Sequence, residues 1–328
     1  MEQRTLGRTG RAVGVVGLGA WQIGADWGEV SEDVAMQTLR AALDAGVTFI
    51  DTADVYGDGR SERLVGRLLK ERQDSALVVA TKMGGRAEPH VAAAYTPDNF
   101  RRWNDRSRDN LGLDTLDLVQ LHCPPDEVYA TESVFDALDE MVANGRMRAY
   151  GVSVETCAQA LAAIARPHVA TVQIILNCLR QKPLDEVLPA ARQSGVGIIA
   201  RVPLASGLLS GKYDESTTFP AGDHRTYNRH GQAFDLGETF SGVDFETGVA
   251  VAREFAALTP TSATPAQLAL RWIIDQPGTT VVIPGARNVE QARANAAAAD
   301  LPPLDETTTG AIRDLYETQV RGAVHNRW

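Results

Sequence analysis

Four titratable residues lie where short apolar runs of the sequence end. Asp51 ends one run and Tyr56 follows it five residues later, while Lys82 and His122 end the next two runs. A carboxylate and an ammonium beside a phenol can tune the acidity of that phenol. An unpaired polar group at the end of a buried strand is costly. Singly, a strand-end lysine or histidine is most often solvated or structural, but the series favours an acid–base site.

The elements that must position these residues alternate regularly along the chain. Short apolar runs read as buried parallel strands, and helical patterns with polar caps separate them. Eight such strands are expected at 15–19, 47–51, 76–82, 117–121, 149–153, 171–175, 196–201 and 280–284. Helices are expected at 31–45, 61–71, 97–111, 131–144, 155–164, 183–193, 244–258, 264–275, 288–298 and 305–321.

This rhythm predicts an α/β fold, a (β/α)8 TIM barrel. A hairpin over residues 4–16 would cover the bottom, and extra helices would follow strand 7 and occur at the C-terminus. No linker divides residues 1–328, so one domain is expected. An open, doubly wound sheet is the alternative. Gly17 and Gly19 resemble a dinucleotide fingerprint, but the third glycine is missing and the loop continues through Gly24 and Gly28. The Rossmann motif therefore fails.

The amino-acid composition limits the kinds of partner that we expect this protein to bind. The 328 residues are 44% hydrophobic and 23% charged, as in ordinary globular proteins, and the net charge of −10 disfavours nucleic acid. The three cysteines form no zinc or disulfide pattern, and no apolar run approaches the length of about 20 residues that spans a membrane. We expect a cytoplasmic protein that acts on a small molecule, with no metal and no membrane partner. No oligomeric state is predicted.

Taken together, the motifs resemble the aldo-keto reductase family over essentially the whole chain. The matching segments are 17–21 (GLGAW), 49–57 (FIDTADVYG), 80–82 (ATK), 121–122 (LH), 151–153 (GVS), 203–212 (PLASGLLSGK) and 283–287 (IPGAR). By this resemblance Asp51, Tyr56, Lys82 and His122 are the catalytic tetrad. Tyr56 would donate a proton to a carbonyl oxygen, made easier by Lys82, which Asp51 holds, and His122 would orient that oxygen.

The resemblance also implies cofactor and substrate contacts. Arg287, next to a helix N-terminus, suits a 2′-phosphate, so NADPH is favoured and NADH is less expected. The implied cofactor contacts are Ala20, Trp21, Asp51, Ser153, Gln173, Asn177, Arg201, Val202, Pro203, Leu204, Ser206, Lys212, Pro284, Gly285, Ala286, Arg287, Gln291 and Asn295. The implied substrate pocket is Trp21, Val55, Tyr56, Met83, His122 and Pro124, to which Trp27, Phe234 and the C-terminal residues could add.

Two positions depart from the family pattern. Arg201 stands where many relatives carry an aromatic residue that stacks on the nicotinamide, and Val154 stands where an asparagine often follows the serine. A guanidinium is planar and can lie against a ring, but its charge disfavours the oxidised nicotinamide. Our hypothesis is that Arg201 replaces the aromatic stack and alters cofactor preference or release.

The leading function is an NADPH-dependent reductase of aldehydes or ketones, with Tyr56 as general acid. Alternatives within the same fold are an NAD(P)-linked sugar or polyol dehydrogenase working in the oxidative direction, and a nucleotide-binding regulatory subunit. A further alternative is an isomerase or aldolase in which Lys82 forms a Schiff base.

Overall fold

Eight parallel strands form the centre of the structure, a computed structural model that describes residues 1–24 and 27–328. Each strand pairs with its neighbours in chain order. Parallel bridges between Val16 and Val282 and between Gly19 and Gly285 join the first strand region to the last, so the sheet closes. The strands are β3 (Leu18–Gly19), β4 (Phe49–Asp51), β5 (Val78–Met83), β6 (Leu116–His122), β7 (Met147–Ser153), β8 (Val169–Ile175), β9 (Gly197–Arg201) and β10 (Thr279–Val282).

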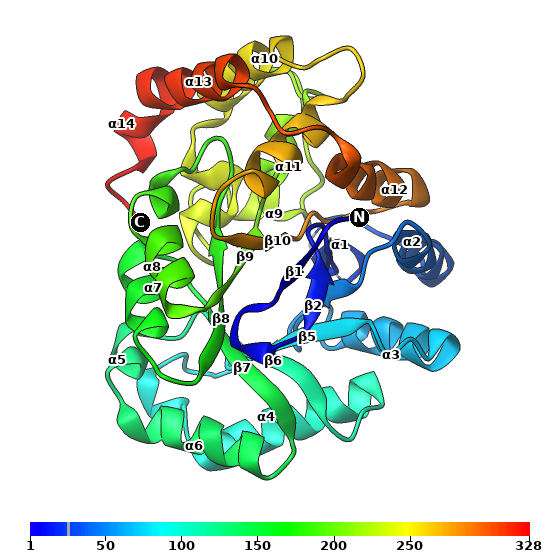
Figure 1. Ribbon diagram of the computed structural model, residues 1–328, viewed down its shortest axis with the longest axis vertical. Helices are drawn as coiled ribbons and strands as arrows, with labels where there is room; N and C mark the ends of the chain where they lie inside the picture. The colour runs from blue at the N-terminus through cyan, green and yellow to red at the C-terminus, as the bar shows by residue number, and fades with distance from the viewer. Residues whose placement is uncertain (25–26) are drawn as a thin grey trace.

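Helices surround these strands, as Figure 1 shows. The helices that alternate with the barrel strands are α2 (Glu32–Asp44), α3 (Arg60–Arg72), α4 (Pro97–Leu111), α6 (Glu132–Ala143), α7 (Cys157–Ile164), α8 (Val187–Ser194), α11 (Pro265–Ile274) and α12 (Val289–Ala297). The extra helices are α10 (Phe245–Ala257) after β9, and α13 (Glu306–Leu315) and α14 (Arg321–Val324) near the C-terminus. The short helices α1 (Trp21–Gly24), α5 (Asp126–Tyr129) and α9 (His224–Tyr227) lie in loops.

The (β/α)8 prediction is confirmed, and the closing bridges exclude the open sheet. Every predicted strand overlaps an observed one, and the predicted hairpin is present as β1 (Gln3–Thr5) and β2 (Ala12–Gly14). Ser31 caps α2 by accepting the N–H of Val34, as its type suggested. No helix in the described part of the chain is both long and apolar enough to cross a membrane.

Two predicted helices differ from the observed ones. The segment expected at 183–193 opens with a separate 3₁₀ turn, Lys182–Leu184, before α8 begins at Val187. Pro189 has no N–H to donate, so it is tolerated in the first turn of a helix but not in its interior. The helix expected at 305–321 is divided into α13 and α14 by a π-helical turn, Tyr316–Val320.

The barrel interior is built in layers because alternate side chains of a strand share a face. An apolar layer contains Phe49, Ala80, Leu118 and Ile199, and the hairpin residues Leu6 and Val13 pack into the same cluster. Two residues further along the same strands come Asp51, Lys82, Gln120 and Arg201. The polar layer at the C-terminal ends therefore rests on an apolar layer closed below by the hairpin.

The hairpin turn offers a matched pair of substitutions that tests this closure. Gly7 and Gly10 both have positive φ (49° and 69°). A Cβ at Gly7 would collide with the Ala170 carbonyl and the Gly197 amide, whereas a Cβ at Gly10 meets nothing within 4 Å. We expect Gly10→Ala to cost about 1 kcal/mol of unfolding free energy and Gly7→Ala about 2–4 kcal/mol. Urea unfolding followed by circular dichroism measures both, and equal losses would contradict the close packing of the hairpin.

Candidate active site

Lys82 is the centre of the polar layer. Its Nζ lies 2.5 Å from Asp51 Oδ2, 3.0 Å from the Thr52 carbonyl oxygen and 3.2 Å from the Tyr56 hydroxyl. An ammonium has three donors and no acceptor, so the Tyr56 oxygen must accept its hydrogen bond. The phenolic proton of Tyr56 is then left for a different acceptor. This arrangement is what a proton donor to a substrate oxygen requires.

The charges around Tyr56 act in opposite directions. Burial raises the pKa of Tyr56 to about 12, with a contribution from the charge of Asp51, while the Lys82 ammonium lowers it. The expected effect of Lys82 on the phenol is therefore present, but burial outweighs it. The charge of Asp51 keeps the pKa of Lys82 above its usual value although burial opposes this. Lys82 is a permanent cation here.

The second carboxylate oxygen of Asp51 accepts two side-chain amides. Nε2 of Gln120 lies 3.0 Å from Asp51 Oδ1, and Nε2 of Gln173 lies 2.7 Å from the same oxygen. Ser153 Oγ lies 3.5 Å from Gln173 Oε1. Gln173 and Ser153 were predicted site residues, whereas Gln120 was missed. Its signal in the sequence is an amide inside the apolar run 118–121, two residues before His122.

His122 lies beside Tyr56 with a ring-centroid separation of 6.1 Å and an interplanar angle of 87°. Burial, together with the charges of Lys82 and Arg201, holds the pKa of His122 well below its usual value. The imidazole is therefore neutral near pH 7, with one nitrogen that donates and one that accepts. A neutral imidazole can hydrogen-bond a carbonyl oxygen without competing for the proton that Tyr56 gives.

Aromatic rings cover Tyr56. Trp21 stacks on it at 5.8 Å and 17°, and His224 and Phe234 lie 5.0 and 6.0 Å from the Trp21 ring. Trp27 completes the group at 4.5 Å from His224. His224 was not predicted as a pocket residue, because loop sequences carry no periodic signal. Of the other predicted pocket residues, Met83 and Pro124 are buried and Val55 is half-buried.

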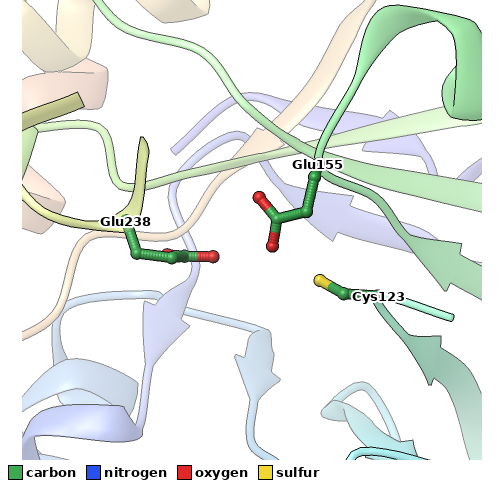
Figure 2. A group of neighbouring side chains, drawn as sticks. All are labelled: Cys123, Glu155 and Glu238. Carbon is green, nitrogen blue, oxygen red and sulfur yellow. The ribbon is translucent and has the colours of Figure 1, made fainter. Parts of the chain in front are cut away.

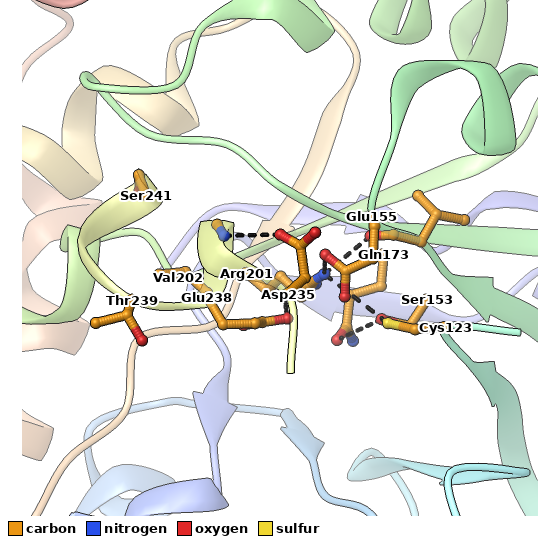
Figure 3. Close-up of polar contacts among 12 residues, drawn as sticks. Cys123, Ser153, Glu155, Gln173, Arg201, Val202, Asp235, Glu238, Thr239 and Ser241 are labelled. Atoms are coloured by element: carbon orange, nitrogen blue, oxygen red, sulfur yellow. Dashed lines mark hydrogen bonds and ion pairs between the residues drawn. The ribbon is translucent and has the colours of Figure 1, made fainter. Parts of the chain in front are cut away.

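Arg201 is held by two carboxylates at the barrel mouth: Figure 2 shows Glu155 and Glu238, and Figure 3 shows them with Arg201. Its guanidinium pairs with Glu238 and, at 3.2 Å, with Glu155, and it donates to the Val154 carbonyl at 2.9 Å. Cys123, Glu155 and Glu238 place potential metal-ligand atoms within 4.8 Å of one another. The cation that those carboxylates would attract is already supplied by Arg201. The positive charge that we expected near the nicotinamide is therefore compensated.

The two glutamates differ in their electrostatics. Burial, with a contribution from the charge of Glu155, raises the pKa of Glu238 to about 7, although Arg201 opposes this. Arg201 keeps the pKa of Glu155 below its usual value although burial opposes it. Neither glutamate was predicted as a site residue: Glu155 precedes α7, and Glu238 ends a 3₁₀ turn, Leu236–Glu238, in the long segment. Together they tie β7 and β9 to the long segment that follows β9.

That long segment also contacts the predicted cofactor residues. Ser206 accepts the Phe240 N–H and donates to the Glu238 carbonyl, each at 3.0 Å. Nδ2 of Asn177 donates to the Val202 carbonyl at 2.8 Å and to Ser241 Oγ at 2.7 Å. Asn177 therefore holds the long segment against the end of β8, and its role as a cofactor contact stays a prediction. Pro203 is buried, Leu204 is half-buried and Lys212 is exposed.

The predicted adenosine-side residues border a hollow of about 250 Å³ between the N-terminal ends of α2 and α12. Arg287, Asn288 and Gln291 line one side, and residues 29–31 with Val34 line the other. Gln291 accepts the Arg287 N–H at 2.8 Å, and Asn295 donates to the Gly285 carbonyl at 3.1 Å. Pro284, Ala286 and, on the adjacent strand region, Ala20 are buried beside these elements. Two helix N-termini and an arginine favour an anion here.

This fold and this set of side chains are those of the aldo-keto reductases. Residues 15–317 match the model of the Aldo/keto reductase family. Aldo-keto reductase YhdN of Bacillus subtilis is 32% identical over 308 residues, which is 90% of this chain and 87% of the relative. The chain belongs to the aldo/keto reductase family. It is accordingly an NAD(P)H-dependent oxidoreductase that acts on carbonyl or alcohol groups.

Solved structures agree with this membership. A glycerol dehydrogenase from Gluconobacter oxydans is 30% identical with a TM-score of 0.76, and the match covers 97% of this chain and 94% of that one. An aldo-keto reductase from Klebsiella pneumoniae in complex with NADPH is 25% identical with a TM-score of 0.70, covering 98% and 99% of the two chains. Both likenesses extend over nearly the entire length of each chain.

The Arg201 ion pairs give a prediction for stability. Arg201→Met leaves Glu155 and Glu238 facing each other without the cation that pairs with both of them, which should raise both pKa values. Folding then becomes less favourable as the pH rises and both groups ionise. We expect a loss of about 3–5 kcal/mol of unfolding free energy at pH 8 and a smaller loss at pH 5.

Adding Glu238→Gln to Arg201→Met should recover most of that loss. Arg253→Met is the matched control, because Arg253 pairs with Glu215 on the surface, and it should cost less than about 1 kcal/mol. Urea unfolding at the two pH values measures all of these. A loss for Arg201→Met that is the same at pH 5 and pH 8 would contradict the assigned charges.

Proposed function

We propose that this protein reduces an aldehyde or ketone to an alcohol with NADPH, and that Tyr56 is the general acid. The observation that supports this proposal most directly is the hydrogen bonding of Lys82. Its ammonium donates to Asp51 and Tyr56, which leaves the phenolic proton of Tyr56 for the substrate. The aromatic group over Tyr56 supports a carbonyl substrate bound against an apolar wall. We further propose one domain and a cytoplasmic location, on the grounds of an undivided sequence and its cysteine usage.

The residues divide the chemistry between them. When bound, the reduced nicotinamide supplies the hydride for the carbonyl carbon. Tyr56 gives its proton to the carbonyl oxygen, and Lys82 stabilises the phenolate that remains. His122, neutral and adjacent, hydrogen-bonds the same oxygen and sets its direction. Solvent returns the proton to Tyr56 after the alcohol leaves.

The residues present fit the proposed cofactor. The hollow beside Arg287 supplies a cation and two helix N-termini for a phosphate. Gln173 and Ser153 offer an acceptor and a hydroxyl at the barrel mouth for a carboxamide. The Klebsiella pneumoniae structure contains NADPH, and a Schizosaccharomyces pombe relative, 28% identical, is named aldo-keto reductase yakc [NADP(+)]. We assign Arg201 to the nicotinamide end, where its plane would replace an aromatic ring.

The oxidation of a polyol or sugar is the second candidate. The Gluconobacter oxydans structure is a glycerol dehydrogenase, and the same acid–base set works in both directions. A Schiff base on Lys82 is disfavoured, because the nitrogen is a buried cation with all three donors used. A purely regulatory role is also disfavoured, because the contacts of Asp51, Lys82 and Tyr56 are those that proton transfer needs.

Tyr56→Phe tests the proposed chemistry. It should lower kcat for NADPH-dependent reduction of aldehydes by a factor of about 10²–10⁴, since it removes the acid, together with the acceptor of one Lys82 hydrogen bond. NADPH affinity, followed by tryptophan fluorescence, should stay within about threefold of wild type. Tyr95→Phe is the matched control, because the Tyr95 hydroxyl contacts His90, at 2.9 Å, and not Lys82.

A panel of aldehydes with NADPH and of glycerol and sugars with NADP⁺ decides the direction. A Tyr56→Phe enzyme that keeps more than about a tenth of wild-type kcat would exclude Tyr56 as the acid.

Arg287→Met tests the choice of cofactor. Because the guanidinium would pair with the 2′-phosphate, the change should raise the Kd for NADPH about 10- to 100-fold and leave the Kd for NADH unchanged. Arg293→Met on the exposed side of α12 should change neither. If wild type binds NADPH and NADH equally well, Arg287 does not read the phosphate and NAD-linked oxidation gains support.

A further inference from the structure

We propose that Gln120 is a positioning residue for the reaction, whose side-chain amide fixes Asp51 and decides which end of Gln173 faces the cofactor. This inference rests on the proposed function. Gln120 lies on β6, fully buried, one layer above Leu118 and one layer below His122 on the same face of the strand. Its Nε2 donates to Asp51 Oδ1 at 3.0 Å, and its Oε1 accepts from Gln173 Nε2 at 3.4 Å.

These two contacts fix the orientation of the Gln120 amide. Asp51 offers a carboxylate oxygen, which can only accept, so the nitrogen of Gln120 must face it. Its oxygen then faces Gln173 and accepts from that amide. The Gln120 amide cannot be flipped, because a flip would place its Oε1 against the carboxylate oxygen of Asp51.

The orientation passes on to Gln173. Nε2 of Gln173 has two hydrogens, and they go to Asp51 Oδ1 at 2.7 Å and to Gln120 Oε1 at 3.4 Å. Oε1 of Gln173 is therefore turned towards Ser153 Oγ, 3.5 Å away, at the ends of β7 and β8. A carboxamide that binds there meets an acceptor for its N–H donors. Without Gln120, one Gln173 hydrogen loses its partner and the amide is free to rotate.

The same amide affects the acid. Asp51 Oδ1 accepts from Gln120 and Gln173, so part of its charge is drawn away from Lys82. The charge of Asp51 raises the pKa of Tyr56, and Lys82 lowers it. Removing the Gln120 donor should strengthen the first influence and leave the phenol a weaker acid. Gln120 thus connects the carboxamide position with proton transfer, although it touches neither reactant.

Gln120→Met and Leu118→Met make a matched pair on one strand face. Both place the same flexible apolar side chain in the barrel interior, but only the first removes hydrogen bonds. Gln120→Glu keeps the shape of the side chain and replaces the donor with an acceptor, and it serves where Gln120→Met does not fold. Each variant is compared with wild type by thermal melting before any other measurement.

The binding measurement needs no turnover. NADP⁺ and adenosine 2′,5′-bisphosphate share the phosphate end, and only NADP⁺ carries the nicotinamide. For Gln120→Met, the affinity for NADP⁺ relative to that for the bisphosphate should fall about tenfold, while the Kd of the bisphosphate stays unchanged. In turnover, kcat should fall about 10- to 100-fold and the KM for NADPH should rise about tenfold, because NADPH carries the same carboxamide, while the KM for the carbonyl substrate stays within about threefold. The deuterium isotope effect on hydride transfer should rise, and the basic limb of the kcat–pH profile should move upward.

Each outcome decides the proposal. The positioning role would be established by two results together. Gln120→Met must show the changes in affinity ratio, isotope effect and pH profile given above, and Leu118→Met must keep the wild-type values of all three. Equal effects in the two variants, or a Gln120→Met enzyme with a wild-type affinity ratio and pH profile, would overturn it and leave the reductase assignment intact. A wild type that binds neither nucleotide or reduces no carbonyl would overturn the proposed function itself, and this is seen before any variant is made.

Discussion

The buried contact between Lys82 and Asp51 is the constraint on which the site depends. Both side chains are nearly inaccessible to solvent, and a lone charge in that place would be far less stable than the pair. The pair fixes the Lys82 ammonium, and the ammonium fixes the direction of the Tyr56 hydroxyl. Asp51 in turn needs donors on its second oxygen, and Gln120 and Gln173 provide them. The Tyr56 hydroxyl, the Lys82–Asp51 pair and the two amides therefore form one connected set of hydrogen bonds.

The barrel makes such a set possible because its strands are in register. Lys82 pairs with Gln120 and Ser153 pairs with Gln173 across neighbouring strands, and Asp51, at the end of β4, reaches Lys82 on the adjacent strand β5. The apolar layer beneath them excludes water, which strengthens each charge interaction above it. The hairpin closes that layer from below. A residue far from the site, such as Leu6, thus helps to set the electrostatics of Tyr56.

The sequence made the strands predictable, because buried parallel strands are short apolar runs, and it indicated that the polar residues at the strand ends would meet, because those ends lie at one face of a barrel. The roles of residues inside the apolar runs and in the segments between them were less predictable from the sequence. Gln120 is an interior position, and its meaning depends on which face it shares with Leu118 and on what Gln173 offers from another strand. Glu155 precedes α7 and Glu238 ends a 3₁₀ turn, 83 positions further along the chain, and only the fold brings them to Arg201.

The case of Arg201 shows why a residue type alone does not give a local charge. From the sequence, a guanidinium at this position placed a positive charge near the oxidised nicotinamide. In the folded chain Glu155 and Glu238 both lie against it, so the group as a whole is not cationic when they are ionised. Because burial raises the pKa of Glu238 to about 7, the balance is set near neutral pH by a residue of the long segment after β9. The position of that segment therefore decides the field at the barrel mouth.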